Sequence, residues 1–309
     1  MNKKISFVVP VYFEEDVISR FIFEMTEELK LLNINYEIVF IDDGSEDETI
    51  QIIKDYATKN TNLKLIELSY NHGKQAALTA GITHATGDYL IYMDPDLQDP
   101  PKEIGRFITE IEKGYDLVFG VRKEKKDTFL NRMFSKIFWG VLIQFTGLNL
   151  PKGLAVMRIF NRKFADKFLE YQEQNRFIEG IFVHVGMKQS TITIEQRERY
   201  AGTSKFNFGK KMELAFNAIF DFSELPLKLA VKLGAVFIII GILTLLSIVF
   251  LKIYLVDFQS GWPSIIGALI IATGVQLFFM GIAALYIGKI YKESKGRPLF
   301  SIRELTNFD

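Results

Sequence analysis

Short apolar runs alternate with longer amphipathic segments over the first 120 residues of the chain. The apolar runs are rich in β-branched and aromatic residues and predict strands at residues 5–11, 36–41, 63–68, 89–93 and 117–121. The segments between them have helical spacing and predict helices at residues 16–31, 47–58, 74–84 and 101–113. This alternation is typical of an α/β fold in which helices cover a mainly parallel, Rossmann-like sheet.

The pattern changes after residue 120. Residues 127–168 predict an apolar helix, an irregular patch at 147–160 and another helix, and residues 191–196 predict a further strand. Residues 208–222 place apolar side chains on one helical face and charged side chains on the other. Such a helix either lies in the headgroup plane of a membrane or packs on the α/β domain.

Two long uncharged stretches lie near the C-terminus, at residues 233–251 and 258–288. Each is long enough to cross a hydrocarbon core, which needs roughly 20 apolar residues. Lysine and arginine residues flank the pair on both outer sides, whereas the link at 254–261 contains none. By the positive-inside bias, we expect a multi-pass protein of the cell (inner) membrane with its α/β domain and both termini in the cytoplasm.

These patterns together predict five regions. They are an α/β domain at 1–206, an interfacial amphipathic helix at 207–229, transmembrane helices at 230–256 and 263–288, and a cytoplasmic tail at 289–309.

Charge and cysteine content narrow the chemistry. Basic and acidic residues number 37 each, so no overall charge indicates a nucleic-acid partner. The absence of cysteine excludes a disulfide framework and a thiolate metal site. The three histidines have no metal-ligand spacing, so none is assigned to a metal.

An acidic turn directly follows the predicted strand at 89–93. Asp94 and Asp96 are separated by one residue, and Gln98 adds a third oxygen donor. Two carboxylates and an amide oxygen suit a hard cation, so the turn predicts an Mg²⁺ or Mn²⁺ site. The alternative is a surface turn that caps the following helix.

Polar residues also end the first two strands. Val9-Pro10-Val11-Tyr12-Phe13-Glu14-Glu15 closes one strand, and Ile41-Asp42-Asp43-Gly44-Ser45 closes the next. Because neighbouring strand ends share one crevice in such a sheet, these residues could hold a base and a ribose. A tight turn that caps the helix beginning near Asp47 is the alternative for the second motif, and both can hold together.

Three basic side chains are placed to meet phosphates. Arg122 ends the fifth strand, and Arg199 and Lys205 belong to a loop with glycine and small residues that could act as a lid. Each could instead be a solvated surface charge. The segment Asn71-His72-Gly73-Lys74 lacks the spacing of a Walker motif and predicts a turn that starts the next helix, with Lys74 a candidate phosphate contact.

Several motifs occur in a fixed order along the chain: Val-Pro-Val-Tyr-x-Glu-Glu, Asp-Asp-Gly-Ser, Asn-x-Gly-Lys, Asp-x-Asp-Leu-Gln-Asp-Pro-Pro and Arg-x-x-Gly-x-Ser-Lys. In this order they resemble the family 2 glycosyltransferases of the GT-A fold. The particular likeness is to polyprenyl-phosphate glycosyltransferases related to dolichol-phosphate-mannose synthase and the bactoprenol glucosyltransferases. The paired C-terminal spans are also similar, so the resemblance covers nearly the whole chain.

The resemblance implies a role for each candidate residue. Asp94, Asp96 and Gln98 are implied to hold the metal and the donor diphosphate. The implied nucleotide pocket consists of Pro10, Tyr12, Glu14, Ile41 and Asp43. Arg122, Arg199 and Lys205 are implied to contact donor and acceptor phosphates. The implied reaction inverts the anomeric centre when the phosphate of a polyprenyl lipid attacks the sugar of a nucleotide sugar.

One segment departs from the family pattern. Where relatives have an Asp-x-Gly-x-Phe-Arg segment, residues 153–158 read Gly-Leu-Ala-Val-Met-Arg, and only Arg158 is retained as a candidate. A carboxylate expected near the acceptor is therefore missing. This leaves open the sugar and the alternative of a membrane-tethered subunit that binds the nucleotide sugar without turnover.

The resemblance also implies the partners. UDP-glucose and undecaprenyl phosphate are the first choice of donor and acceptor, with mannose or formamido-arabinose as alternative sugars. A separate flippase would move the product, and the chain would assemble as a homo-oligomer among membrane lipids. A processive polysaccharide synthase is disfavoured because the chain has no Gln-x-x-Arg-Trp segment.

Overall fold

The computed structural model describes residues 3–122, 151, 153–174, 176–195, 197, 225–254 and 261–308. These residues belong to two compact units. The first unit contains the described residues up to 197 together with residues 297–308. The second contains the two long helices between them.

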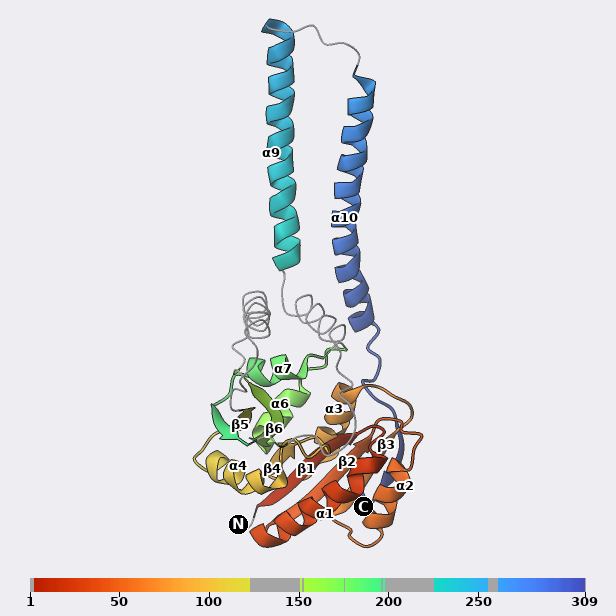
Figure 1. Cartoon of the computed structure of the whole chain (residues 1–309), viewed down its shortest axis with the longest axis vertical. Coiled ribbons are helices and arrows are strands. Elements are labelled where there is room, and N and C mark those ends of the chain that lie inside the picture. The colour runs from red at the N-terminus through yellow and green to blue at the C-terminus, as the bar shows by residue number, and fades with distance from the viewer. Residues whose placement is uncertain are drawn as a thin grey trace. The chain divides into compact units, whose positions relative to one another are not determined.

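A single mixed sheet forms the centre of the first unit (Figure 1). Its strands in the described part of the chain are β1 (Lys4–Val11), β2 (Asn35–Asp42), β3 (Leu63–Leu68), β4 (Tyr89–Tyr92), β5 (Leu117–Arg122), β6 (Leu154–Asn161), β7 (Gln189–Ile194) and β8 (Ile302–Thr306). They are ordered β7-β5-β6-β4-β1-β2-β3-β8. β6 and β8 are antiparallel to their neighbours, whereas the pairs among β1, β2, β3 and β4 and the β5–β7 pair are parallel. The predicted α/β fold with a mainly parallel sheet is confirmed.

Helices cover both faces of this sheet (Figure 1). One face carries α1 (Glu15–Leu32), α2 (Thr49–Ala57) and α4 (Ile104–Ile111), the last preceded by a 3₁₀ turn at Pro101–Glu103. The other carries α3 (Lys74–His84), α6 (Arg162–Leu169) and α7 (Ile178–His184). Because both faces are covered, the central strands are apolar on both sides.

Alternation along the strands assigns side chains to the two layers. Phe7 and Val9 of β1 belong to the core that includes Phe21 of α1. Val8, between them, faces α3, where a Cβ added to Gly81 would lie 2.4 Å from Val8 Cγ1. These side chains are 0% exposed, and full burial of an apolar side chain of this size stabilises a fold by roughly 1.5–3 kcal/mol.

Two strands were not predicted from the sequence. Residues 154–161, assigned to an irregular patch, form β6 in the middle of the sheet. The reading was wrong because β6 is buried on both faces and contains a buried arginine, so it lacks the period-two pattern of a half-buried strand. Residues 302–306, assigned to the tail, form the edge strand β8.

The first unit is stabilised at the amino ends of its strands by a buried carboxylate. Glu37 of β2 is 1% exposed and accepts hydrogen bonds from Lys4 Nζ (2.7 Å), Ser6 Oγ (2.6 Å) and Thr86 N (2.6 Å). Lys64 Nζ lies 3.1 Å from the same carboxylate. Burial alone would raise the pKa of Glu37, but these donors outweigh it and lower the pKa to about 2.

We therefore expect Glu37→Gln to destabilise the protein in a pH-dependent way. A carboxyl group whose folded pKa is depressed contributes stability above its unfolded pKa and loses that contribution as pH falls toward its folded pKa. The variant should lose about 2–3 kcal/mol of unfolding free energy at pH 7, and its difference from the wild type should shrink by about half near pH 3.5. Denaturant unfolding at both pH values measures this.

The control for this variant is Glu27→Gln. Glu27 is paired with Lys30 at 2.9 Å on the exposed surface of α1, where an ion pair contributes little. It should change stability by less than about 0.5 kcal/mol at either pH. An equal loss for Glu37→Gln at pH 7 and pH 3.5 would contradict the assignment.

The second unit contains α9 (Leu225–Tyr254) and α10 (Trp262–Ser294). Both helices are long and apolar enough to cross a membrane, with mean hydropathies of 2.2 over Leu227–Thr244 and 1.8 over Ile271–Ser294. None of the side chains that the structure describes in these windows is buried in the protein. The predicted interfacial helix at 208–222 and the predicted helix after residue 127 lie outside the described residues.

Candidate active site

The loops after β1 and β2 are joined to each other at the carboxyl ends of these strands. Asp43 N donates to Val11 O (3.0 Å), Phe13 N donates to Ser45 Oγ (3.0 Å), and Glu14 N donates to Thr49 Oγ1 (2.9 Å). Short polar side chains of the second loop thus satisfy backbone donors of the first. The two motifs form one structure, as their positions in the sheet predict.

Neighbouring aspartates at the end of β2 have different partners. Asp42 Oδ2 accepts from Gly44 N (3.0 Å) and Ser45 N (2.9 Å), which forms the tight turn. Asp43 instead accepts from His72 N (2.7 Å) and Gly73 N (2.9 Å) in the loop before α3. The turn role expected of the Asp43 motif therefore belongs to Asp42, and Asp43 joins the loops after β2 and β3.

Burial changes the acidity of Asp43, which is 3% exposed. Burial raises its pKa to about 6, with the charge of Asp42 acting in the same direction and the two backbone N–H donors opposing both. Asp43 is therefore a buried hydrogen-bond acceptor that titrates close to neutral pH.

Gly44 allows the loops after β2 and β3 to approach closely. Its φ is +81°, and an added Cβ would lie 2.8 Å from Asn71 N and 2.9 Å from the carbonyl carbon of Tyr70. A side chain here would be strained by the backbone angle and would collide with backbone atoms that cannot rotate away.

We expect Gly44→Ala to lower the unfolding free energy by about 2–3 kcal/mol. The positive φ accounts for about 1 kcal/mol of this loss, and overpacking against the backbone of Tyr70 and Asn71 accounts for a similar or larger part. Gly114→Ala is the matched control. Gly114 has φ +88° but no atom within 4 Å of an added Cβ, so only the first penalty applies. Denaturant unfolding compares the two, and equal losses would show that the contact at Gly44 is unimportant.

The acidic turn after β4 alternates buried and half-exposed residues. Pro95, Leu97 and Asp99 are buried, whereas Asp94, Asp96 and Gln98 are partly exposed. Asp96 Oδ1 accepts from Gln98 N (3.1 Å), and Leu97 has a φ of +59°. Positive φ in a bulky residue is strained, and such strain is concentrated at functional sites.

Lys74 at the start of α3 pairs with Asp94. Its Nζ donates to Asp94 Oδ2 at 2.7 Å. Burial alone would lower the pKa of Lys74, but the Asp94 carboxylate raises it above its ordinary value. Asp94 Oδ1 is buried and has no hydrogen-bond partner among the described residues. An ammonium and an unpartnered carboxylate oxygen therefore lie together at this strand end.

Asp99 connects the acidic turn to β6. Its Oδ2 accepts from Val156 N and Met157 N, both at 3.0 Å, and its Oδ1 is buried without a partner in the described part of the chain. Burial raises the pKa of Asp99, and the hydrogen bond from Met157 N and the charge of Arg122 oppose the rise. Arg122 itself ends β5, where its N–H donates to Gly153 O (2.8 Å).

Arg158 lies in the interior of the sheet and not at its edge. Its guanidinium is 1% exposed and donates to Val156 O (3.0 Å) and Glu179 Oε1 (3.4 Å). It lies within 4.8–5.5 Å of the ring centres of Tyr92, Phe119 and Phe182. A cation enclosed by aromatic faces supports the packing of β4, β5, β6 and α7.

The remaining predicted residues divide into three groups. Pro10 and Ile41 are buried and paired in register, and the Ile41 side chain packs toward Gly81 in the core. Tyr12 and Glu14 are half-buried in the loop after β1. Arg199 and Lys205 lie outside the described residues.

Sequence reasoning assigned no site role to His72 and Asp99, which lie near these strand ends. Their motifs were visible in the sequence, but their hydrogen-bond partners lie in other segments: Asp43 for His72, and Val156 and Met157 for Asp99. Asp99 follows the predicted metal ligands within one motif, and this adjacency was the one signal that could have identified it.

The oxygen donors of the acidic turn fit a hard cation. The unpartnered Asp94 Oδ1 is an available ligand, and carboxylate and amide oxygens are the groups that Mg²⁺ and Mn²⁺ prefer. Within the described ranges, no group of three His, Cys, Asp or Glu side chains could hold a metal by itself. A cation here would complete its coordination with water and substrate phosphates, as Mg²⁺ commonly does.

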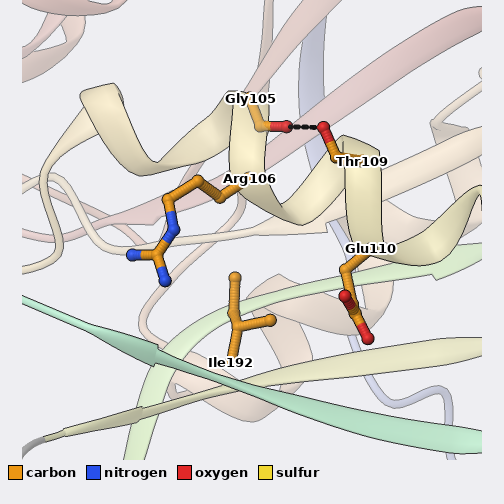
Figure 2. Close-up of a pocket in the computed structure, with 5 residues that line it drawn as sticks. All are labelled: Gly105, Arg106, Thr109, Glu110 and Ile192. Carbon is orange, nitrogen blue, oxygen red and sulfur yellow. Dashed lines mark hydrogen bonds between the residues drawn. The ribbon is translucent and has the colours of Figure 1, made fainter.

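An open hollow elsewhere on the first unit does not coincide with these residues. Figure 2 shows it between α4 and β7, lined by Gly105, Arg106, Thr109, Glu110 and Ile192. Thr109 Oγ1 donates to Gly105 O (2.8 Å) and Glu110 Oε1 accepts from Ser190 Oγ (2.8 Å), so these polar groups are already paired. None of the predicted site residues within the described part of the chain lines it.

The α/β sheet is covered on both faces and carries acidic groups at the carboxyl ends of β1, β2 and β4, as expected of a GT-A domain. Residues 6–169, more than half of the chain, match the family described as Glycosyl transferase family 2, and the chain belongs to that family. It is a glycosyltransferase, as the sequence motifs predict.

Relatives match over almost the full length. An uncharacterized glycosyltransferase of a Synechocystis species is 33% identical over 306 residues, covering 99% of this chain and 96% of the relative. The undecaprenyl-phosphate 4-deoxy-4-formamido-L-arabinose transferase of an Enterobacter species is 29% identical over 310 residues, covering 98% and 94%. A solved mannosyltransferase from Pyrobaculum calidifontis, in complex with GDP-Man and Mn²⁺, is 15% identical with a TM-score of 0.49, covering 93% and 88%.

Proposed function

We propose that this glycosyltransferase transfers a sugar from a nucleotide sugar to a polyprenyl phosphate at the cytoplasmic face of a membrane. The observation that carries the proposal is the group of carboxylates at the carboxyl ends of β2 and β4, on a chain that continues into two apolar helices of 30 and 33 residues. A relative whose name specifies undecaprenyl phosphate as acceptor supports the acceptor class.

The nucleoside part of the donor would bind between the loops after β1 and β2. Asp43 is a buried acceptor suited to an N–H or hydroxyl group of the nucleoside. Tyr12 offers an aromatic ring in the adjacent loop, since it follows Val11, whose carbonyl accepts from Asp43 N. Glu14 belongs to the same joined pair of loops. Pro10 and Ile41, which are both buried, would form the floor of this region in this proposal.

A divalent cation, Mg²⁺ or Mn²⁺, would be held by Asp94, Asp96 and Gln98 in this proposal. When bound, it would neutralise the charge that develops on the leaving diphosphate. Lys74 adds a positive charge beside Asp94, within reach of the same phosphates.

The acceptor requires orientation more than activation. A phosphate monoester is already ionised at neutral pH, so the nucleophile needs positive charge and alignment and not a strong base. Arg122, Arg199 and Lys205 would supply this charge for the donor and acceptor phosphates. This account is compatible with the absence of a carboxylate at Gly153, which has φ +69° and a carbonyl that accepts from Arg122 N.

The two apolar helices would anchor the enzyme in the cell membrane. Lysine and arginine flank them on both outer sides, which favours cytoplasmic termini and a cytoplasmic site. Homo-oligomers and a separate flippase that moves the product outward complete the proposal. Glucose from UDP-glucose is the first sugar to test, and mannose and formamido-arabinose are the alternatives.

The experiment uses membranes that contain the full chain. They are incubated with labelled UDP-glucose, GDP-mannose or UDP-formamido-arabinose, with undecaprenyl phosphate, and with Mn²⁺, Mg²⁺ or a chelator. A labelled glycolipid from one donor, lost with chelator, supports the proposal and names the sugar. Nucleotide-sugar binding without product from any of these donors would favour a binding subunit.

A further inference from the structure

The chain that follows α10 returns to the sheet as β8. β8 pairs antiparallel with β3, from Leu65 opposite Thr306 to Leu68 opposite Ile302. Buried Glu67 of β3 is paired with Lys54 and with Arg303 of β8. Asn307 Nδ2 then donates to Ala57 O (3.0 Å) and Leu63 O (2.8 Å). Backbone pairing, ionic contacts and side-chain caps all hold this segment in place.

The start of this segment contacts the loop that follows β3. Ser69 N donates to Ser301 O at 2.9 Å, so β8 extends the pairing beyond the end of β3. Ser301 N donates to His72 Nε2 at 3.3 Å, which requires that nitrogen to be unprotonated. The His72 ring also lies against Tyr70, with ring centres 3.9 Å apart.

The same loop makes two contacts with the proposed donor site. The backbone N–H groups of His72 and Gly73 donate to Asp43, and the next residue, Lys74, is paired with Asp94. The contacts therefore run from Ser301 through His72 to Asp43, and through Lys74 to Asp94. No residue of β8 itself takes part in the chemistry proposed above.

We propose that β8 and His72 position the donor-site loop at residues 69–74, so that the chain following the second apolar helix forms a working part of the nucleotide-sugar site. His72 is a positioning residue in this proposal, because it acts through the backbone donors that hold Asp43. The inference rests on the proposed function, since Asp43 and Asp94 are assigned there to donor binding.

The geometry explains why a histidine suits this position. Its ring packs against Tyr70, and its Nε2 accepts from Ser301 N. Phenylalanine would keep the stacking and remove the acceptor. Glutamine would restore an acceptor through its side-chain oxygen.

The test measures binding of UDP and of GDP, each with Mn²⁺, by full-length protein in detergent. His72→Phe should raise the Kd for the nucleotide that the wild type binds by about 5-fold, the effect of losing one hydrogen bond that orders a loop. His72→Gln should return the Kd to within about 2-fold of the wild type. The rescue distinguishes positioning through the acceptor from a general packing effect.

His84→Phe is the matched control. The His84 ring lies 5.7 Å from the ring of Phe308, which follows β8, and His84 has no contact with loop 69–74 among those described. It should leave the Kd unchanged. Equal binding by the wild type and His72→Phe would overturn the inference and leave the proposed function standing. Absence of binding by the wild type to either nucleotide would overturn both.

Discussion

Replacing Asp96 with asparagine is expected to lower sugar transfer by at least about 100-fold, because loss of a carboxylate ligand removes charge compensation at the leaving diphosphate. The Asp96 side chain is partly exposed, and its Oδ1 accepts a hydrogen bond from Gln98 N. The side-chain amide oxygen of asparagine can accept the same hydrogen bond. The fold should therefore survive. Transfer is measured with the active donor while the Mn²⁺ concentration is varied. The Mn²⁺ concentration that gives half-maximal transfer should be higher for the variant than for the wild type.

Asp55→Asn provides the control for Asp96→Asn. Asp55 lies on the exposed face of α2 and accepts from Gln51 Nε2 at 2.8 Å, so the same chemical change occurs away from the proposed site. It should alter neither transfer nor the Mn²⁺ midpoint. If Asp96→Asn transferred sugar at the wild-type rate at low Mn²⁺, Asp96 would not be a ligand of the proposed metal site.

Removing the two apolar helices is expected to lower turnover of a long-chain lipid acceptor by roughly 100-fold or more, because an anchored site meets its acceptor at a high effective concentration. The design must keep residues 297–309, since a chain ended after residue 225 would also lose β8. We therefore propose replacing residues 225–296 with a flexible glycine-serine linker. Turnover of undecaprenyl phosphate in vesicles is then compared with that of the full chain.

A water-soluble, short-chain prenyl phosphate provides the control for the linker variant. Because this acceptor needs no membrane, both proteins should use it at rates within about 3-fold of each other. A linker variant that is as active as the full chain on vesicle-embedded acceptor would show that the helices do not serve as the anchor. Loss of activity on both acceptors would show that the linker has damaged the site.

Local patterns predicted most of the first unit. The strand at 63–68 and the helix at 74–84 have the predicted bounds, and the other four strands up to residue 122 differ by one residue at each affected end. Glycine, proline and charged residues mark the ends of these elements, and apolar residues recur at a consistent spacing within each of them. The strand at 154–161 has no such alternation, because both of its faces are buried.

Motif order also predicted that polar residues lie at the strand ends where we propose the site. Asp43 and Asp94 follow β2 and β4, whose carboxyl ends lie at one edge of the parallel part of the sheet, and Arg122 ends β5. The sequence could not predict which of two adjacent aspartates makes the turn, because Asp42 and Asp43 have the same side chain. Asp42 accepts from Ser45 N within its own turn, whereas the partner of Asp43, His72 N, is decided by where the loop after β3 lies.

The sequence by itself therefore determined the family, the α/β class, the acidic strand ends and the two apolar helices, because each depends on residue type and on spacing within a short stretch. Only the tertiary structure decided that Lys74 pairs with Asp94, that Arg158 is enclosed by aromatic rings, and that residues 302–306 close the edge of the sheet beside the donor-site loop. These contacts join segments 20 to more than 200 residues apart, as between Lys74 and Asp94 or His72 and Ser301. Periodicity within a segment carries no information about such partners, since they are selected by the packing of the whole sheet.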